Sequence, residues 1–220
     1  MRDLSVSRES TLISMYEALS ERLGPSNWWP GETPFEVCLG AILTQNTNWS
    51  NVEKALRRLK DRGLLSPRRL ASLEPAELEE IIRPAGYFRV KARRILNFIE
   101  FLTDREAWDL EEPARLPLEE LRPALLAVNG IGPETADSML LYAFEKPSFV
   151  VDAYTARICN RHGLTPEDIS YEQLRDFFMD VLPRDVGLMN EYHALLVRTG
   201  KNWCLKKAGK CEICPLGSFF

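Results

Sequence analysis

The sequence lacks the usual features of membrane and secreted proteins. No apolar run in its 220 residues is long enough to span a bilayer, and the first ten residues contain no hydrophobic signal-peptide core. Alternating apolar and polar runs, which predict half-buried strands, are also missing. We therefore expect a monomeric all-α protein of the cytoplasm, nucleoid-associated in a prokaryote, with no membrane partner.

Cysteine is scarce and unevenly placed. The chain has five cysteines, an odd number, and Cys204, Cys211 and Cys214 lie close together near the C-terminus. This distribution indicates metal ligation in a reducing compartment rather than a disulfide framework. Cys38 and Cys159 lie in apolar helical patterns, so we expect them to be buried thiols.

An overall basic charge is also absent, because the formal net charge is −4. Basic residues are nevertheless clustered in two runs. The first run contains Arg83, Arg89, Lys91, Arg93 and Arg94, and the second contains Arg198, Lys201, Lys206, Lys207 and Lys210. Such runs can attract phosphate groups, although each is also compatible with an ordinary solvated helix face.

Helical periodicity dominates the rest of the chain, and we expect about ten helices joined by short loops. Thr33 and Pro34 form an N-cap and first-turn pair. Ser50 and Glu53 predict a capping box for the next helix. The acidic stretch 104–117 is expected to be an irregular surface connection.

A glycine-rich hairpin separates two expected helices, 118–128 and 133–144. Its residues are Asn129, Gly130, Ile131 and Gly132. Glycine permits a tight turn, and backbone N–H groups at the start of the following helix can face an anion. The hairpin is therefore a candidate DNA phosphate site, and an ordinary helix–helix turn is the alternative.

The hairpin is one of several motifs that resemble the helix-hairpin-helix DNA glycosylases of the endonuclease III superfamily. The motifs are L-x-x-x-x-G-I-G-x-x-T-A from Leu125, V-V-D ending at Asp152, R-I-C-N-R from Arg157 and L-T-Q-N-T from Leu43. The resemblance implies a two-lobed all-α fold with a central cleft. The expected lobes are a helical barrel, 28–136, and a second lobe formed by 1–27 plus 137–220.

Asp152 matches the catalytic aspartate of that family. Cleavage of an N-glycosidic bond builds positive charge on the deoxyribose, and a fixed carboxylate stabilises that charge. Asp152 also opens a predicted helix, so it is a candidate N-cap, and both roles are compatible.

Glu134 stands where bifunctional members of the family have a lysine. That lysine attacks the sugar to form a Schiff base, which a glutamate cannot do. The resemblance therefore implies a monofunctional glycosylase that leaves an abasic site. A favourable charge at a helix N-terminus is the alternative role of Glu134.

Trp28, Trp29 and Trp49 border the base pocket in the fold that the resemblance implies. The motif W-W-P, together with an aromatic residue after L-T-Q-N-T, is similar to the 3-methyladenine glycosylase branch. Alkylated purines are cationic and are attracted to aromatic faces. The alternative is that the tryptophans fill the interface between two helical lobes.

Gln45 matches the residue that family members insert into the duplex when the damaged base is flipped out. An exposed glutamine at the end of a helix is the simpler interpretation.

The C-terminal cysteines follow the spacing C-x6-C-x2-C of the family's iron–sulfur loop. The fourth ligand position falls on Phe220, so only three of the four cysteines of a [4Fe–4S] cluster are present. The resemblance leaves a bound cluster open.

Together these features predict a monofunctional DNA glycosylase of base excision repair. Its expected partner is double-stranded DNA that contains an alkylated purine such as 3-methyladenine. The alternatives are an endonuclease III-like glycosylase for oxidised pyrimidines or mismatches, with or without lyase activity, and a DNA-binding module without catalysis.

Overall fold

The protein is helical throughout the part that the computed structural model describes, residues 7–26, 28, 31–105, 108 and 110–219. A single bridge between Cys204 and Gly209 is the only strand-like pairing in these ranges. The helices are α1 (Arg8–Leu23), α2 (Pro34–Leu43), α3 (Trp49–Asp61), α4 (Pro67–Ala71), α5 (Pro75–Ile81), α6 (Phe88–Thr103), α7 (Glu111–Arg115), α8 (Leu118–Leu126), α9 (Pro133–Tyr142), α10 (Ala153–Arg161), α11 (Tyr171–Met179) and α12 (Val186–Asn202). Short 3-10 turns follow at Arg83–Ala85, Cys211–Ile213 and Gly217–Phe219.

The chain forms two compact units. The inserted unit is Trp29–Lys146, and the split unit combines Met1–Trp28 with Pro147–Phe220. The boundary after Lys146 lies later than the expected boundary at residue 136. The physical reason is that α9 continues to Tyr142 and packs on α2 and α8, which belong to the inserted unit.

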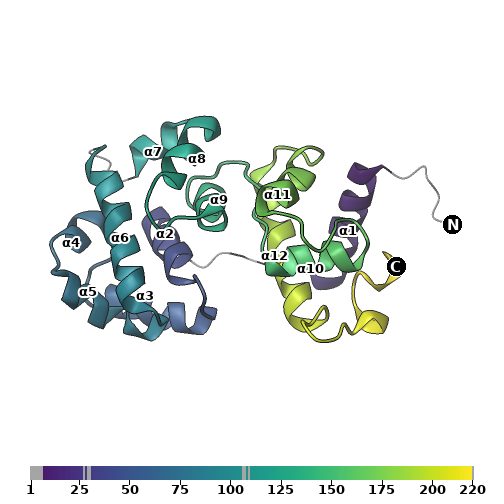
Figure 1. Ribbon diagram of the computed structural model, residues 1–220, viewed down its shortest axis with the longest axis horizontal. Helices are drawn as coiled ribbons and strands as arrows, with labels where there is room; N and C mark the ends of the chain where they lie inside the picture. Colours follow the sequence, from purple (N-terminus) through teal and green to yellow (C-terminus); the bar gives the residue numbers. More distant parts are fainter. Residues whose placement is uncertain (1–6, 27, 29–30, 106–107, 109, 220) are drawn as a thin grey trace. The chain divides into compact units, whose positions relative to one another are not determined.

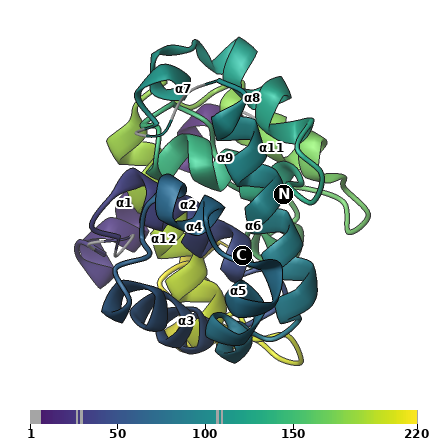
Figure 2. The ribbon, with the colours of Figure 1, turned by 90° about the vertical axis from the view of Figure 1, so that its left-hand side faces the viewer.

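The inserted unit is built around α6. This helix packs against α2, α4 and α5 and buries one apolar face that includes Ile95, Phe98 and Leu102. Figure 2 shows α6 running past α5, with α2 beside it. α9 covers α2 on another side of the same core. The arrangement supports the hairpin between α8 and α9 on a continuous apolar core.

The split unit is built around α12, which packs against α10 and α1 (Figure 1). An aromatic cluster lies in its centre, where the rings of Phe149 and Phe178 are stacked with centroids 4.3 Å apart. The hydroxyl of Tyr192 donates to the carbonyl of Leu12 at 2.9 Å. These contacts hold the N-terminal segment to the C-terminal segment of the chain.

The predicted helix starts are largely observed, with one correction. Thr33 caps α2 and accepts a hydrogen bond from the N–H of Glu36. The Ser50–Glu53 capping box is wrong, because α3 begins two residues earlier than expected. Asn48 is its N-cap, and the Asn48 side chain accepts from the N–H of Asn51 at 3.2 Å.

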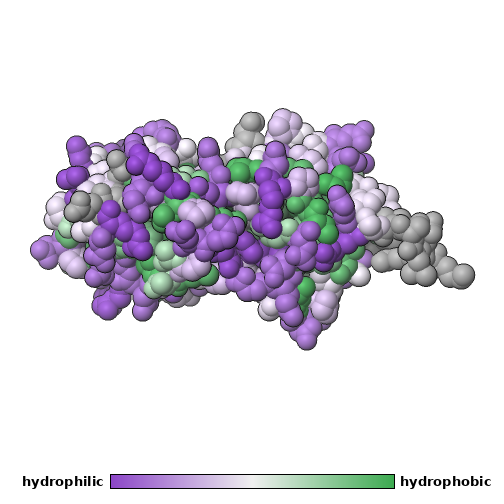
Figure 3. All heavy atoms as spheres, turned by 90° about the horizontal axis from the view of Figure 1, so that it is seen from above, coloured by the Kyte–Doolittle hydropathy of each residue, from purple (hydrophilic) through white to green (hydrophobic). Residues whose placement is uncertain are grey.

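The acidic stretch expected to be irregular contains the five-residue helix α7. No helix in the described ranges is long and apolar enough to cross a membrane. Figure 3 shows one face of the protein, where hydrophilic residues cover most of the surface and apolar areas are smaller.

Candidate active site

The hairpin has the geometry of a tight turn on an apolar anchor. Gly130 has φ +94°, a value that side chains with a Cβ rarely adopt. Ile131 is only 4% exposed and belongs to the core. No hydrogen bond links the backbone N–H groups of Gly130 and Gly132 to another described residue. Pro133 opens α9 directly after them, so these N–H groups lie at a helix N-terminus.

A buried ion pair joins the two helices that flank the hairpin. Arg122 on α8 donates from Nε to Oδ1 of Asp137 at 2.9 Å and from Nη2 to Oδ2 at 3.0 Å. The Asp137 side chain is fully buried and the Arg122 side chain is 17% exposed. Two parallel bonds fix the relative orientation of the two groups more strictly than one bond. The pair therefore sets the angle at which α8 enters the hairpin and α9 leaves it.

Gln45 is tied to the hairpin by three hydrogen bonds. Its Nε2 donates to the carbonyl of Gly130 at 3.2 Å and to Oγ1 of Thr135 at 2.9 Å. Its Oε1 accepts a bond from the guanidinium of Arg94. The side chain thus links the end of α2 to the hairpin.

Arg94 also excludes a side chain at Gly130. A Cβ built on Gly130 would overlap the Cγ of Arg94. The aliphatic part of Arg94 therefore fills the space beside the glycine, while its guanidinium orients the amide of Gln45.

Asp152 lies at the start of α10 in the split unit and is its N-cap. Its Oδ1 accepts from the N–H groups of Tyr154 and Thr155 at 2.9 and 2.8 Å. The hydroxyl of Thr155 donates to the same oxygen at 3.0 Å. The second oxygen, Oδ2, is 3.7 Å from Nε2 of His193 on α12. One carboxylate oxygen is therefore fixed by the helix, and the other has fewer bonds.

Two opposing influences set the pKa of Asp152. Burial raises this pKa, but the hydrogen bond and charge of His193, together with the bonds from Thr155, lower it by more. The net pKa lies below the ordinary value of an aspartate. The side chain, 14% exposed, is therefore an ionised carboxylate at neutral pH.

Glu134 lies in the first turn of α9 and is exposed. Lys91, the buried lysine of the same unit, is engaged elsewhere. Its Nζ donates to the carbonyls of Leu43 and Ala85 at 2.8 and 2.7 Å. Burial, with a contribution from the charge of Arg94, lowers the pKa of Lys91 to about 8. Its amine closes the end of α2, which is a structural role.

The candidate base-pocket tryptophans belong to different units. Trp49 starts α3 and packs against the core of the inserted unit. Trp28 belongs to the split unit, and the ammonium of Lys201 lies 5.8 Å from its ring centroid. Trp29 lies outside the described residues.

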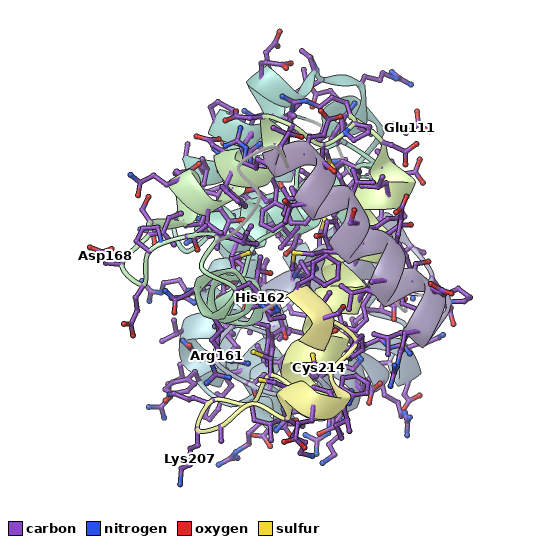
Figure 4. The ribbon with its side chains drawn as sticks, turned by 90° about the vertical axis from the view of Figure 1, so that its right-hand side faces the viewer. Glu111, Arg161, His162, Asp168, Lys207 and Cys214 are labelled. Atoms are coloured by element: carbon purple, nitrogen blue, oxygen red, sulfur yellow. The ribbon has the colours of Figure 1, made fainter. Side chains whose placement is uncertain are left out.

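The three C-terminal cysteines line one small cavity of about 10 Å³, together with Arg161 and His162 of α10. Figure 4 shows Arg161, His162 and Cys214 in the same region of the split unit. Arg161 donates to the sulfur of Cys204 at 3.4 Å and to the carbonyl of Leu205 at 2.8 Å. Protein contacts thus hold the loop against α10.

The described residues include three cysteines near the C-terminus, one fewer than an iron–sulfur cluster usually takes. They contain no group of three or more histidine, cysteine or acidic side chains that could hold a metal ion. The ring nitrogens of His162 lie against backbone carbonyls, 2.8 Å from that of Ile158 and 3.3 Å from that of Leu216. The expected fourth position, Phe220, lies outside the described residues.

Sequence reasoning missed the roles of His193, Arg94 and Asp137, and only Asp137 offers a signal that could have revealed its role. His193 lies far from Asp152 along the chain, and only the packing of α12 on α10 brings the two together. Arg94 looks like one more member of a basic run. Asp137 stands in a helix that is otherwise buried, where a lone carboxylate requires a partner, and this requirement is a signal that could have revealed Arg122.

Comparison with known proteins agrees with the motifs. The model of the HhH-GPD superfamily, described as base excision DNA repair proteins, matches residues 39–184. A protein of Methanocaldococcus jannaschii named for a DNA repair glycosylase is 43% identical over 210 residues, which are 94% of each chain. Endonuclease III of Thermotoga maritima is 31% identical over 83% of this chain and 80% of its own length.

Solved structures have the same fold. A trapped covalent intermediate of endonuclease III with DNA has a TM-score of 0.81 at 23% identity and covers 94% of this chain and 93% of its own. The 3-methyladenine DNA glycosylase of H. pylori, bound to 1,N6-ethenoadenine, has a TM-score of 0.74 at 27% identity. It covers 89% of this chain and 97% of its own.

Proposed function

This chain belongs to the HhH-GPD superfamily of base excision DNA repair proteins, and we propose one specific reaction for it among those that DNA N-glycosylases catalyse. The proposed reaction is hydrolysis of the N-glycosidic bond of alkylated purines, such as 3-methyladenine, in double-stranded DNA. The enzyme releases the base, leaves an abasic site and does not cut the strand.

Two observations carry the proposal, namely that Asp152 is ionised and that Glu134, rather than a lysine, follows the hairpin. Asp152 is an ionised carboxylate held at a helix N-terminus, which suits the stabilisation of a positively charged sugar. Glu134 supplies no amine for a Schiff base. The amine of Lys91 is buried and bonded to two carbonyls, so it does not replace the missing lysine.

In the proposed reaction, the bond between the anomeric carbon and the base nitrogen breaks, and its electron pair leaves with the base. Positive charge develops on the sugar, and the carboxylate of Asp152 stabilises it. Water then adds its oxygen to the anomeric carbon and releases a proton to the carboxylate or to solvent. The helix and Thr155 hold Oδ1 in place, so Oδ2 is the oxygen that faces the charge.

We propose alkylated purines because their release needs little catalysis beyond the stabilisation of the sugar's positive charge by Asp152. The positive charge of the alkylated ring already makes the base a good leaving group. Aromatic faces attract such a cation by about 0.5–2 kcal/mol per contact, and Trp28 holds the cation of Lys201 in that way. Similarity to the 3-methyladenine glycosylase of H. pylori supports the same substrate class.

A second candidate is the removal of oxidised pyrimidines or mismatched bases. It is supported by the relatives named endonuclease III, which are more numerous than the alkylpurine enzymes among the similar proteins. A DNA-binding module without catalysis is the third candidate, and it leaves the ionised Asp152 with its capping role alone.

The test is a base-release screen with duplex oligonucleotides that carry methylated purines, oxidised pyrimidines, uracil or mismatches. Wild-type protein is expected to release 3-methyladenine and to leave strands intact until alkali is added. Asp152→Asn keeps the size and much of the capping geometry but removes the charge, so release should be abolished while DNA binding persists. Borohydride should trap no covalent adduct with either protein.

Equal release by wild type and Asp152→Asn would remove the aspartate from the mechanism. A trapped adduct would show a lyase, and preferred release of oxidised pyrimidines would favour the second candidate. An absence of release from every duplex would leave the binding module.

A further inference from the structure

An open groove of about 670 Å³ lies beside the hairpin in the inserted unit. Helix α5 contributes Pro75 and Glu79, and the hairpin contributes Asn129 and Gly130. The remaining lining comes from α6. These residues are Arg89, Val90, Ala92, Arg93, Arg94, Leu96 and Asn97. The groove therefore joins one face of α6 directly to the candidate phosphate site.

The first basic run, from Arg83 to Arg94, divides into structural and accessible members. Lys91 is buried on two carbonyls, and Arg94 is bonded to Gln45. Arg83 pairs with Glu80 at 2.8 Å. Arg89 and Arg93 are exposed and line the groove.

Little negative charge opposes these two arginines. Glu79 is the acidic residue of the groove lining, and its Oε2 is 3.7 Å from Nε of Arg89. No hydrogen bond or ion pair links Arg93 to another residue in the part of the chain that the structure describes. Three arginines against one carboxylate give the groove a positive character in a chain whose formal charge is −4.

The groove also has a direction. Arg89, Arg93 and Asn97 are spaced four residues apart, so they lie along one face of α6 over about 12 Å. That length corresponds to about three or four nucleotide steps of a DNA strand. At the far end, Nδ2 of Asn97 donates to the carbonyl of Asn129 at 2.8 Å. The stripe thus ends at the hairpin.

We propose that this groove binds the sugar–phosphate backbone of the DNA duplex on the flank of the hairpin, with Arg89 and Arg93 contacting phosphates. The proposal rests on the proposed function only for the identity of the polymer. Charge complementarity and continuity with the hairpin favour a DNA strand over an acidic protein segment as the occupant. Contacts to phosphate fix position on the duplex without reading its sequence.

If the groove contacts phosphates, its contribution to DNA affinity should depend on salt concentration. Each phosphate contact releases counterions, and the slope of log K against log salt concentration changes by about 0.9 per contact on duplex DNA. The double variant Arg89→Gln/Arg93→Gln should therefore reduce the magnitude of the slope by about 1.8. Binding is measured with an undamaged DNA duplex, so the measurement requires no base release.

A matched control is available on α3. Arg57 and Arg58 are exposed in the same unit and outside the groove lining, so Arg57→Gln/Arg58→Gln removes the same charge elsewhere. Its slope should remain that of wild type. Val90, which is 50% exposed in the groove, offers a second variant, and Val90→Glu should weaken binding more than Val90→Gln.

Equal slopes for the groove and control variants would overturn the proposal, as would equal binding by the two Val90 variants. If the groove substitutions weakened binding of an acidic peptide but not of DNA, the groove would be assigned to a protein partner. That result would also overturn the proposal. Base release by wild type is measured separately, so failure of the glycosylase proposal and failure of the groove are distinguishable.

Discussion

The pKa of Asp152 is influenced by a residue from another helix. His193 lowers the pKa of Asp152, while burial alone would raise it. In His193→Leu the lowering interactions of His193 are lost, while burial and the bonds from Thr155 remain, so the pKa of Asp152 should rise above its wild-type value. Activity that requires the ionised carboxylate should then be lost at a higher pH than in wild type. The acidic limb of kcat/KM against pH measures this shift.

His193→Gln is the matched variant, because glutamine can still donate a hydrogen bond but carries no charge. Its acidic limb should lie between those of wild type and His193→Leu. The same linkage acts on stability: a lowered folded-state pKa stabilises the protein at neutral pH, and this contribution is lost as the pH falls through that pKa. Coincident acidic limbs in all three proteins would assign His193 a packing role only.

At the scale of single residues, the sequence predicts the chemical role of a side chain better than it predicts the residues that the side chain contacts. Asp152 is predicted as an N-cap from its place before a helical pattern, and the structure has it in that position. Gln45 is predicted as exposed or DNA-inserting, whereas it is bonded to Gly130 and Thr135 in the free protein. Local patterns do not encode contacts between residues that are distant in the chain.

At the scale of elements, the buried pair Arg122–Asp137 holds α8 and α9 on either side of the hairpin. Asp137→Asn leaves the guanidinium mostly buried without its charge partner, which costs about 3–5 kcal/mol in comparable pairs. The free energy of unfolding from urea titration should fall by that amount.

Glu111→Gln is the control for this prediction, because Glu111 pairs with Arg115 at 2.7 Å on the exposed surface of α7. Exposed pairs of this spacing contribute at most about 0.5 kcal/mol. Similar losses in the two variants would show that Asp137 and Arg122 do not clamp the hairpin.

Helix ends show which capping residues can be predicted from the local sequence. Thr33 and Asp152 cap as predicted, since each precedes an unambiguous helical pattern. Asn48 caps α3 in place of the Ser50–Glu53 box, because two polar residues separated only by Trp49 offered alternative starts. The side chain nearest the preceding turn makes the cap, and Ser50 donates to it at 2.6 Å.

At the scale of the whole molecule, the inserted unit interrupts the split unit. The C-terminal half of the split unit must therefore bind an N-terminal helix that is distant in the chain. Arg198 of α12 makes part of this connection, donating to the carbonyls of Leu23 and Gly24 at 2.9 and 3.1 Å. These are the last carbonyls of α1, which no intrahelical donor satisfies.

Arg198→Met keeps the aliphatic stem and removes both donors. The free energy of unfolding should fall by about 1.5–3 kcal/mol, the contribution typical of hydrogen bonds to a charged group. Lys207→Met removes a charge from an exposed position of the same basic run and should have little effect. Equal effects would mean that α1 is held by its apolar face alone.

The two basic runs contain cations with different roles, and composition does not show which role each cation has. Both are predicted as possible phosphate sites, yet Lys91, Arg94 and Arg198 bind carbonyl or amide oxygens inside their own units. A count of charges does not distinguish a cation that closes a helix from one that faces solvent. Only packing makes that distinction.

Arg94 and Gly130 have a consequence for how such hairpins diverge. The arginine stem occupies the space that a Cβ at position 130 would need. An alanine at 130 would need a smaller residue at 94 and would still be strained, because Gly130 has φ +94°, a value that residues with a Cβ rarely adopt. A change at 94 alone therefore does not open position 130 to other residues, and the glycine is expected to persist in hairpins that diverge from this one.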